Sequence, residues 1–132
     1  EKGVGAFVNG KRVRVSSIDD PERAAVSTGN LKSLAASAGW ERLGEIVAMA
    51  DRIRGYGDFY HYHLLASGKI EAVIESDVNI LDIAALSVLV TEAGGVFTDL
   101  NGNPPGLDTR SVLAANPALH AHYLEQLAGF VD

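Results

Sequence analysis

The chain has 132 residues, of which 47% are apolar and 21% are charged, with a formal net charge of −6 and no cysteine. This composition is typical of one folded domain, and the absence of cysteine excludes disulfides and thiolate metal sites. The negative charge disfavours nucleic acid as a partner, because phosphate backbones bind clustered Lys and Arg. No apolar run approaches the roughly 20 residues that span a bilayer, and no secretory signal opens the sequence. We therefore expect a cytoplasmic protein that does not enter a membrane.

In chain order, the first predicted element is a β-hairpin. Residues 6–8 and 11–15 are strand-like, and Asn9-Gly10 between them supplies the two positive-φ residues of a type I′ turn. The basic side chains of the second strand alternate with valines, so we interpret them as a solvent-exposed strand face; they are Lys11, Arg12 and Arg14.

The middle of the chain alternates between strand-like and helix-like patterns. It predicts, in order, a strand, two helices, a strand that runs into a turn, and a third helix, over residues 24–27, 31–38, 40–50, 53–58 and 59–67. Gly39 separates the first two helices, and Gly68 suits the end of the third.

The last part of the chain continues this alternation. It predicts a strand, a helix, two strands and a final helix, over residues 70–74, 81–93, 96–98, 111–115 and 117–127. The helix over 81–93 is apolar on nearly every side, so we expect it to be buried. Asn116 suits an N-cap and Pro117 the first helical position. We predict one α/β domain over residues 1–132, in which helices flank a mixed, mostly parallel sheet.

The histidines give little indication of a metal or catalytic site. They form two pairs with a spacing of two, which points the rings of each pair in different directions on a helix: His61 with His63, and His120 with His122. We interpret all four as surface or half-buried side chains.

Three carboxylates are stronger candidates for a site. Asp58 follows Gly57 at a predicted strand-to-helix turn, Glu75 closes a strand, and Asp82 begins the apolar helix. The local pattern favours structural roles, with Asp58 and Asp82 as helix caps and Glu75 as a solvated strand end. The alternative is a ligand site, because ligands bind at strand ends in α/β sheets and Mg²⁺ takes oxygen ligands.

Four segments of the sequence form a recognisable set. They read G-A-F-V-N-G at 5–10, L-D-I-A-A at 81–85, E-A-G-G-V-F-T-D at 92–99 and A-A-N-P at 114–117. In this order and spacing, the set resembles the C-terminal half of the inositol monophosphatase superfamily of magnesium-dependent phosphatases. The segment R-G-Y-G-D-F-Y at 54–60 resembles the histidinol-phosphatase branch, whereas enzymes for inositol phosphates usually have G-S/T-A-A there.

The resemblance implies a role for each candidate residue. Asp82 matches an aspartate that binds the catalytic Mg²⁺, and Glu75 matches a position that contacts the organic part of the substrate. Asp58, with Gly57 before it, falls where the non-phosphate end of the substrate lies, and a carboxylate there could pair with the amine or imidazole of histidinol phosphate. Ser27 lies near another substrate-side position.

The sequence departs from the family pattern in two places. Leu81 replaces the usual Trp or Tyr before the aspartate, which changes packing more than ligation. The paired glutamates and the D-P-hydrophobic-D-G-T/S motif of the family, which supply most metal ligands, have no counterpart here. We therefore expect this chain to be a C-terminal part that lacks the N-terminal half and is inactive by itself.

Three functions remain open at this point. The first is a C-terminal part of a histidinol-phosphate phosphatase of histidine biosynthesis, which uses Mg²⁺ and hydrolyses a small-molecule phosphate monoester. The second is an enzyme for inositol, sugar or nucleotide phosphates. The third is a non-catalytic folding or dimerisation domain. The resemblance also implies a homodimer.

Overall fold

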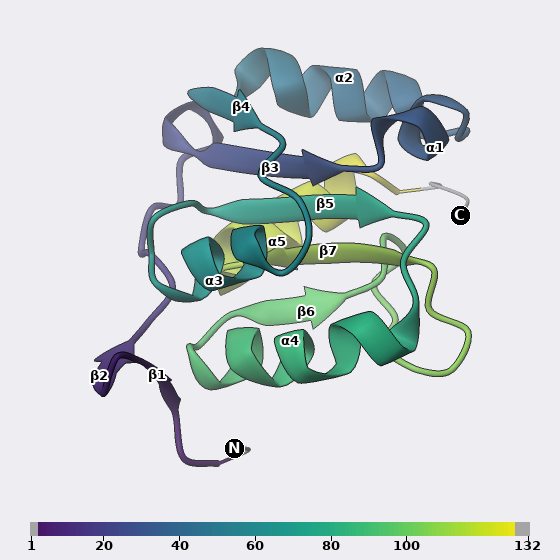
Figure 1. Ribbon diagram of the computed structural model, residues 1–132. Coiled ribbons are helices and arrows are strands. Elements are labelled where there is room, and N and C mark those ends of the chain that lie inside the picture. The colour runs from purple at the N-terminus through teal and green to yellow at the C-terminus, as the bar shows by residue number, and fades with distance from the viewer. Residues whose placement is uncertain (1–2, 129–132) are drawn as a thin grey trace.

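The computed structural model describes residues 3–128, which form a five-stranded sheet with helices on both faces and a separate β-hairpin (Figure 1). The strands are β1 Ala6–Val8, β2 Lys11–Val13, β3 Ala25–Gly29, β4 Arg52–Arg54, β5 Ala72–Ser76, β6 Val96–Thr98 and β7 Ser111–Ala115. The helices are α1 Leu31–Ala35, α2 Trp40–Met49, α3 Tyr60–Ala66, α4 Ile80–Glu92 and α5 Pro117–Gln126, with a 3-10 helix, η1, at Pro21–Arg23. The α/β class and the order of elements are therefore confirmed.

The sheet is mixed, with strand order β4-β3-β5-β7-β6. β3 is parallel to both β4 and β5, and β7 is antiparallel to both β5 and β6. Among the described strands of this sheet, β7 alone therefore opposes the direction of the others, which confirms a mixed and mostly parallel sheet. Parallel neighbours need long crossovers, and α1, α2 and α3 lie in those connections (Figure 1).

Alternate strand residues pack against helices on opposite faces of the sheet. On β5, Ala72 and Ile74 face a core that includes Leu34 of α1, Leu43 and Ile46 of α2, and Leu119, Tyr123 and Leu127 at α5. Val73, between them, faces a second core that includes Tyr62 and Leu65 of α3 and Ile83 and Val90 of α4. This two-residue period is the expected signature of a sheet that is covered on both sides.

The predicted hairpin is present, and its Asn9-Gly10 turn has the positive φ angles that such a turn requires, 51° and 78°. The residues that flank the hairpin form hydrogen bonds with the C-terminal end of α4 at two points. The Gly5 N–H donates to Glu92 Oε1 at 2.8 Å, and the Val15 N–H donates to the Ala93 carbonyl at 2.9 Å. The Gly5 N–H is the main cause that lowers the pKa of the Glu92 carboxyl.

The expectation that the helix over 81–93 is buried is wrong. Only Ile83 and Val90 of α4 are buried, and Leu81 is 87% exposed. α4 packs against α3, β6 and β1, and its remaining apolar residues are half-buried except for Leu81, Ala84 and Ala85, which are exposed. A helix that is apolar on every face is usually surrounded by other parts of a protein, and this is why the sequence of α4 predicts burial. No helix within residues 3–128 has both the length and the apolarity to cross a membrane.

The histidine prediction is correct for one member of each pair. His63 and His122 are exposed, but His61 and His120 are buried, because one ring of each pair turns toward the sheet. The Thr98 hydroxyl donates to the Asp99 carbonyl at 2.7 Å and lies 2.8 Å from His120 Nε2, so the imidazole donates this second bond.

We expect His120 to make stability depend on pH. Burial lowers the pKa of the His120 imidazole, so the folded chain binds this proton less readily than the unfolded chain. The resulting stabilisation is present above the unfolded pKa of about 6.5 and is lost as the pH falls toward the folded pKa. Urea unfolding at pH 7.5 and 5.5 should therefore show a smaller loss in His120→Gln than in the unaltered chain. The exposed His122→Gln is the control, and equal losses in all three proteins would contradict the prediction.

Candidate active site

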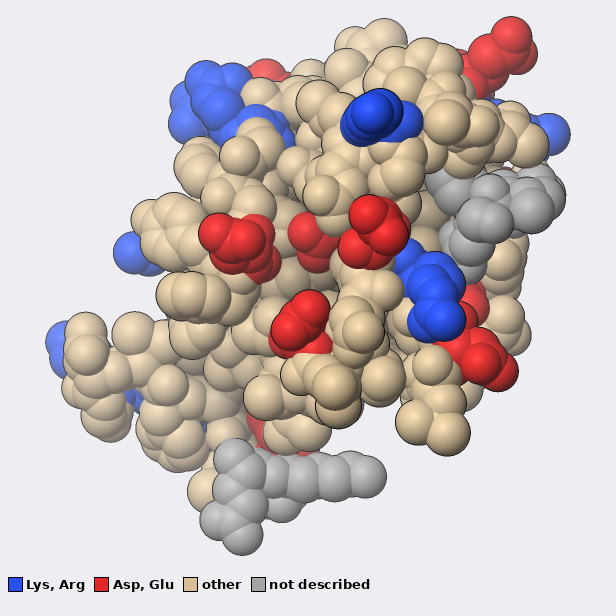
Figure 2. All heavy atoms as spheres, turned by 45° about the vertical axis from the view of Figure 1, so that its right-hand side comes forward, with Lys and Arg blue, Asp and Glu red and all other residues tan. Residues whose placement is uncertain are grey.

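A cleft of about 580 Å³ opens where β3 and β5 end. Its walls come from the ends of these two strands, the loop before α3 and the first turns of α4, and its polar residues are Asn30, Asp58, Tyr62, Glu75, Asp77, Asn79 and Asp82. Figure 2 shows acidic side chains around a hollow on this side of the molecule. The carboxyl ends of parallel strands are the usual place for a ligand in such a sheet.

The structure brings four of the five predicted site residues together. Gly57, Asp58, Glu75 and Asp82 all line the cleft, although they are up to 25 residues apart in the sequence. Ser27 does not line it. The convergence results from the topology, because the β4–α3 loop passes in front of the sheet and α4 begins beside the end of β5 (Figure 1).

The backbone of the cleft is unusual. Asn30, Asp58 and Asp77 have positive φ angles of 59°, 49° and 55°, and all three line the cleft. Among residues 3–128, the other non-glycine residue with positive φ is Asn9 in the hairpin turn. Left-handed backbone in non-glycine residues costs energy and is concentrated at functional sites. The strain therefore supports this cleft as the site.

Glu75 is the most enclosed of the four carboxylates in the cleft. It is 8% exposed, and its Oε1 accepts a hydrogen bond from the Tyr62 hydroxyl. Burial, with the Glu75 charge as a further cause, raises the pKa of the Tyr62 phenol far above its usual value. Tyr62 therefore stays protonated and donates to Glu75. The alternative of a solvated strand end does not fit this environment.

Gly29 makes room for Glu75. A Cβ on Gly29 would lie 2.5 Å from Glu75 Oε2, and this is a closer approach than real Cβ atoms make. Gly29→Ala should therefore displace the carboxylate and destabilise the fold by about 1–3 kcal/mol, the usual cost of overpacking. The free energy of unfolding in urea measures the loss.

Gly44→Ala is the matched control for this substitution. Gly44 lies inside α2, and a Cβ there would meet no atom within 4 Å. It should stabilise the chain by about 0.5–1 kcal/mol, because alanine is the better helix former. Equal effects of the two substitutions would mean that Gly29 is not constrained by Glu75.

Asp58 is exposed and does not cap α3. The N-cap of α3 is Phe59, and no side chain makes a capping hydrogen bond there. Asp58 instead occupies the left-handed position next to Gly57, with its carboxylate at the cleft. This leaves the carboxylate available to a ligand.

Asp82 does not cap α4 either. The N-cap is Asn79, whose Oδ1 accepts the Leu81 N–H at 2.8 Å, and Asp82 is exposed in the first turn. Within residues 3–128, no three His, Asp or Glu side chains are grouped so that they could hold a metal ion. One carboxylate in a cleft nevertheless fits Mg²⁺, which typically takes one or two protein carboxylates and completes its shell with water and phosphate.

Ser27 lies beneath the cleft rather than in it. Its side chain is fully buried on β3, where Oγ accepts the Tyr56 N–H at 3.1 Å and lies 2.9 Å from His61 Nδ1. In this arrangement it has no path to a ligand. A direct substrate contact from Ser27 is not supported by this position.

Sequence reasoning missed several residues of the cleft. Tyr62 supplies the bond to Glu75, Asn30 and Asp77 supply left-handed turns, and Asn79 caps α4. Asn79 could have been found, because it stands immediately before the apolar run in a typical capping position. Nothing in the local sequence around Tyr62 indicates its long-range contact.

Three comparisons place the chain among known proteins. Residues 1–130 match the model of the inositol monophosphatase family. The chain is 37% identical to a histidinol-phosphatase of Mycobacterium tuberculosis, across 96% of this chain and 50% of the relative. It is 32% identical to human inositol monophosphatase 1, across 87% of this chain and 43% of the relative. The chain thus spans about half the length of the curated relatives that it matches.

Solved structures show the same partial coverage. The extragenic suppressor protein suhB of Bartonella henselae superposes with a TM-score of 0.87 at 27% identity, over 98% of this chain and 50% of that one. An IMPase of Thermotoga maritima gives a TM-score of 0.85 at 27% identity, over 96% and 49%. The sheet, the cleft at its strand ends and these matches lead to one assignment: the chain belongs to the inositol monophosphatase family.

Proposed function

We propose that this chain forms the substrate-side wall of a phosphate monoester hydrolase whose substrate carries a positive charge, as histidinol phosphate does. The observation that carries the proposal is the charge of the cleft. Its lining residues within the described part of the chain include four carboxylates and no Lys or Arg. A cationic amine or imidazole complements such a wall, whereas the ring of inositol is neutral and needs no carboxylate charge.

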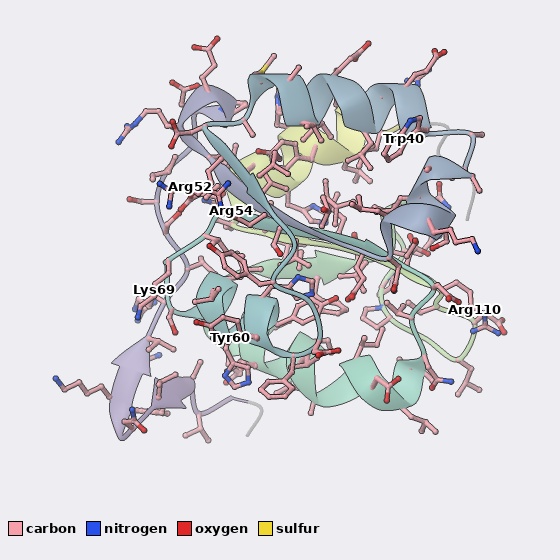
Figure 3. All side chains as sticks on the ribbon, turned by 45° about the horizontal axis from the view of Figure 1, so that its top comes forward. Trp40, Arg52, Arg54, Tyr60, Lys69 and Arg110 are labelled. Carbon is pink, nitrogen blue, oxygen red and sulfur yellow. The ribbon has the colours of Figure 1, made fainter. Side chains whose placement is uncertain are left out.

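The distribution of positive charge supports the same reading. Figure 3 shows Arg52, Arg54 and Lys69 at one end of the sheet. Arg52 pairs with Ala25 at the start of β3 and Lys69 precedes β5, so these two cations lie where the strands begin. Arg54 is the last residue of β4 and pairs with Ser27. The carboxylates lie where the same strands end.

Arg110 lies at the cleft end of the sheet, because it precedes β7 and its carbonyl accepts the Val78 N–H at 3.0 Å, but it does not line the cleft. The carboxylates that line the cleft therefore attract a positively charged group with no Lys or Arg among the lining residues.

Aromatic side chains complete the proposed binding surface. Phe59 is 63% exposed and lines the cleft together with Tyr62, which donates to Glu75. Aromatic faces attract planar cationic rings such as imidazolium. Glu75 and Asp58 would accept hydrogen bonds from the cation, and Phe59 would cover one side of it.

Asp82 is the residue that would hold Mg²⁺ at the phosphate side of the cleft. A bound Mg²⁺ supplies charge neutralisation for the phosphate and stabilises the attacking and leaving oxygens. Asp82 would anchor the ion to the first turn of α4, while Glu75 and Asp58 orient the organic end of the substrate. The remaining ligands would come from the half of the family's enzymes that this chain does not span.

The runner-up is an enzyme for inositol, sugar or nucleotide phosphates, which the human relative's name favours. The alternative from another class is a non-catalytic folding or dimerisation domain, favoured by the open apolar surface of α4. The homodimer and the cytoplasmic location stay predictions.

Phosphate release with Mg²⁺ tests the proposed reaction. The chain alone should release none from histidinol phosphate or inositol monophosphate. A hybrid of this chain with the upstream half of the Mycobacterium tuberculosis relative should hydrolyse histidinol phosphate faster than inositol monophosphate. Asp82→Asn in the hybrid should lower the rate on histidinol phosphate by about a hundredfold or more, the usual scale for an important electrostatic contact. Release by the hybrid that survives Asp82→Asn would contradict the metal-binding role.

A further inference from the structure

A buried chain of polar contacts connects the loop before α3 to the carboxylate of Glu75. The Tyr56 N–H donates to Ser27 Oγ at 3.1 Å, and Ser27 Oγ lies 2.9 Å from His61 Nδ1. His61 Nε2 lies 3.4 Å from Glu75 Oε1, the oxygen that also accepts from Tyr62. These contacts cross from β3 to α3 and then to β5, so they join three elements that sequence reasoning treats separately.

The direction of the bonds follows from what each atom can do. Ser27 Oγ accepts the Tyr56 N–H, and among the described residues His61 Nδ1 is the polar atom left to accept the buried hydroxyl proton, so we assign the hydroxyl as the donor to Nδ1. Nδ1 is then an acceptor, and the imidazole carries its proton on Nε2. Nε2 is fully buried and lies 3.4 Å from Glu75 Oε1, in a geometry that falls short of a hydrogen bond. An unprotonated Nε2 would place its lone pair against the carboxylate oxygen, so the contact favours a proton on Nε2.

A serine, a histidine and a glutamate in this order could also indicate a nucleophilic serine. The geometry argues against that function. Ser27 is fully buried on β3 and does not line the cleft, and its oxygen already accepts a backbone N–H. No substrate carbonyl or phosphate can reach Ser27, so Glu75 is the group in this series of contacts that a ligand can reach.

We propose that Ser27 and His61 are positioning residues that hold Glu75 and the loop carrying Asp58 in a fixed relation to each other. Ser27 anchors the loop through the Tyr56 N–H, and His61 orients the carboxylate of Glu75. The two carboxylates on the organic side of the cleft are thereby set by one buried unit. Only the role of these carboxylates toward a cationic substrate rests on the proposed function; the contacts of Ser27 and His61 do not.

The ¹⁵N resonances of the imidazoles in the 132-residue chain test this directly. The neutral ring of His61 should show a protonated Nε2 and an unprotonated Nδ1, while exposed His63 and His122 serve as internal references. His61 is assigned by the loss of its signals in His61→Gln. A neutral His61 ring with its proton on Nδ1, observed at a pH high enough to remove the second proton, would overturn the proposal without any variant having to fold.

Ser27→Ala tests the two contacts of the Ser27 hydroxyl separately from its effect on stability. Loss of the hydroxyl should speed hydrogen exchange at the Tyr56 amide about tenfold, the scale of one hydrogen bond, and shift the His61 tautomer toward the Nδ1–H form. Ser17→Ala, at an exposed serine, is the control and should change neither. Unchanged His61 signals in Ser27→Ala would overturn the link between Ser27 and His61.

Histidinol binding to the same samples separates this inference from the proposed function. Predicted tautomers with no histidinol binding would leave the positioning unit standing and would contradict the proposed function. Histidinol binding in a chain whose His61 carries its proton on Nδ1 would support the proposed function and contradict the positioning role of Ser27 and His61. When both hold, we expect Ser27→Ala to weaken histidinol binding about tenfold, matching the loss of one hydrogen bond.

Discussion

Replacing Asn116 by alanine should destabilise the chain by about 2–4 kcal/mol, as the sum of a lost helix cap and lost buried hydrogen bonds. Asn116 is 3% exposed, and its Oδ1 accepts the Leu119 N–H at 3.0 Å at the start of α5. Its Nδ2 also donates to the carbonyls of Ser16 at 3.1 Å and Ile18 at 2.8 Å. The single amide therefore joins α5 to the segment that precedes β3.

Asn79→Ala is the matched control for this prediction. Asn79 caps α4 through the Leu81 N–H at 2.8 Å, but it is exposed, so its loss should cost about 1 kcal/mol. Urea unfolding of the two variants measures the difference. Equal losses would mean that the contacts to Ser16 and Ile18 contribute nothing beyond the cap.

Replacing Glu75 by glutamine should weaken histidinol binding by about 10- to 100-fold while changing inositol binding little. The substitution keeps the shape of the side chain and an oxygen that can accept from Tyr62, but it removes the charge. A hydrogen bond to a charged group contributes about 1.5–3 kcal/mol, which corresponds to that range of affinity.

The measurement is the dissociation constant of each ligand at fixed pH and salt. Asp108→Asn is the control, because Asp108 is exposed in the loop before β7 and does not line the cleft. A parallel loss of both ligands in Glu75→Gln would indicate a general disturbance of the cleft, and no loss of either would exclude Glu75 from the binding surface.

Local signals were sufficient for most of the fold. The Asn9-Gly10 turn predicted the hairpin, and Asn116-Pro117 predicted the start of α5. β3 and β5 were placed within a few residues, because buried parallel strands read as short apolar runs. Such runs indicate that a segment is buried but not where its hydrogen bonding ends.

The burial of α4 could not be predicted from its sequence. Its apolar residues cover all sides, and this pattern indicates that the helix needs cover without saying which part of a protein supplies it. In this chain one side packs on α3 and β6, while Leu81, Ala84 and Ala85 are exposed. An open apolar surface of this kind favours association with another chain or segment.

The candidate site was partly predictable for a similar reason. The carboxylates Asp58, Glu75 and Asp82 follow strand ends or begin a helix, which are positions visible in the sequence. The partners of Glu75 were not visible, because Tyr62 and His61 reach it only after α3 packs against β5. Ser27 lies on β3, a strand that ends at the cleft, but its side chain points to His61 and not to the cleft, because side chains alternate between the two faces along a strand.

A titration of the ¹⁵N-labelled chain with histidinol, with inositol as the comparator, is the most direct test of the account. We predict saturable shifts at the amides of Gly57, Asp58 and the end of β5 with histidinol, and much weaker shifts with inositol. Histidinol shifts that are absent from the cleft, or inositol shifts of equal strength there, would contradict the claim that this family member recognises a positively charged substrate.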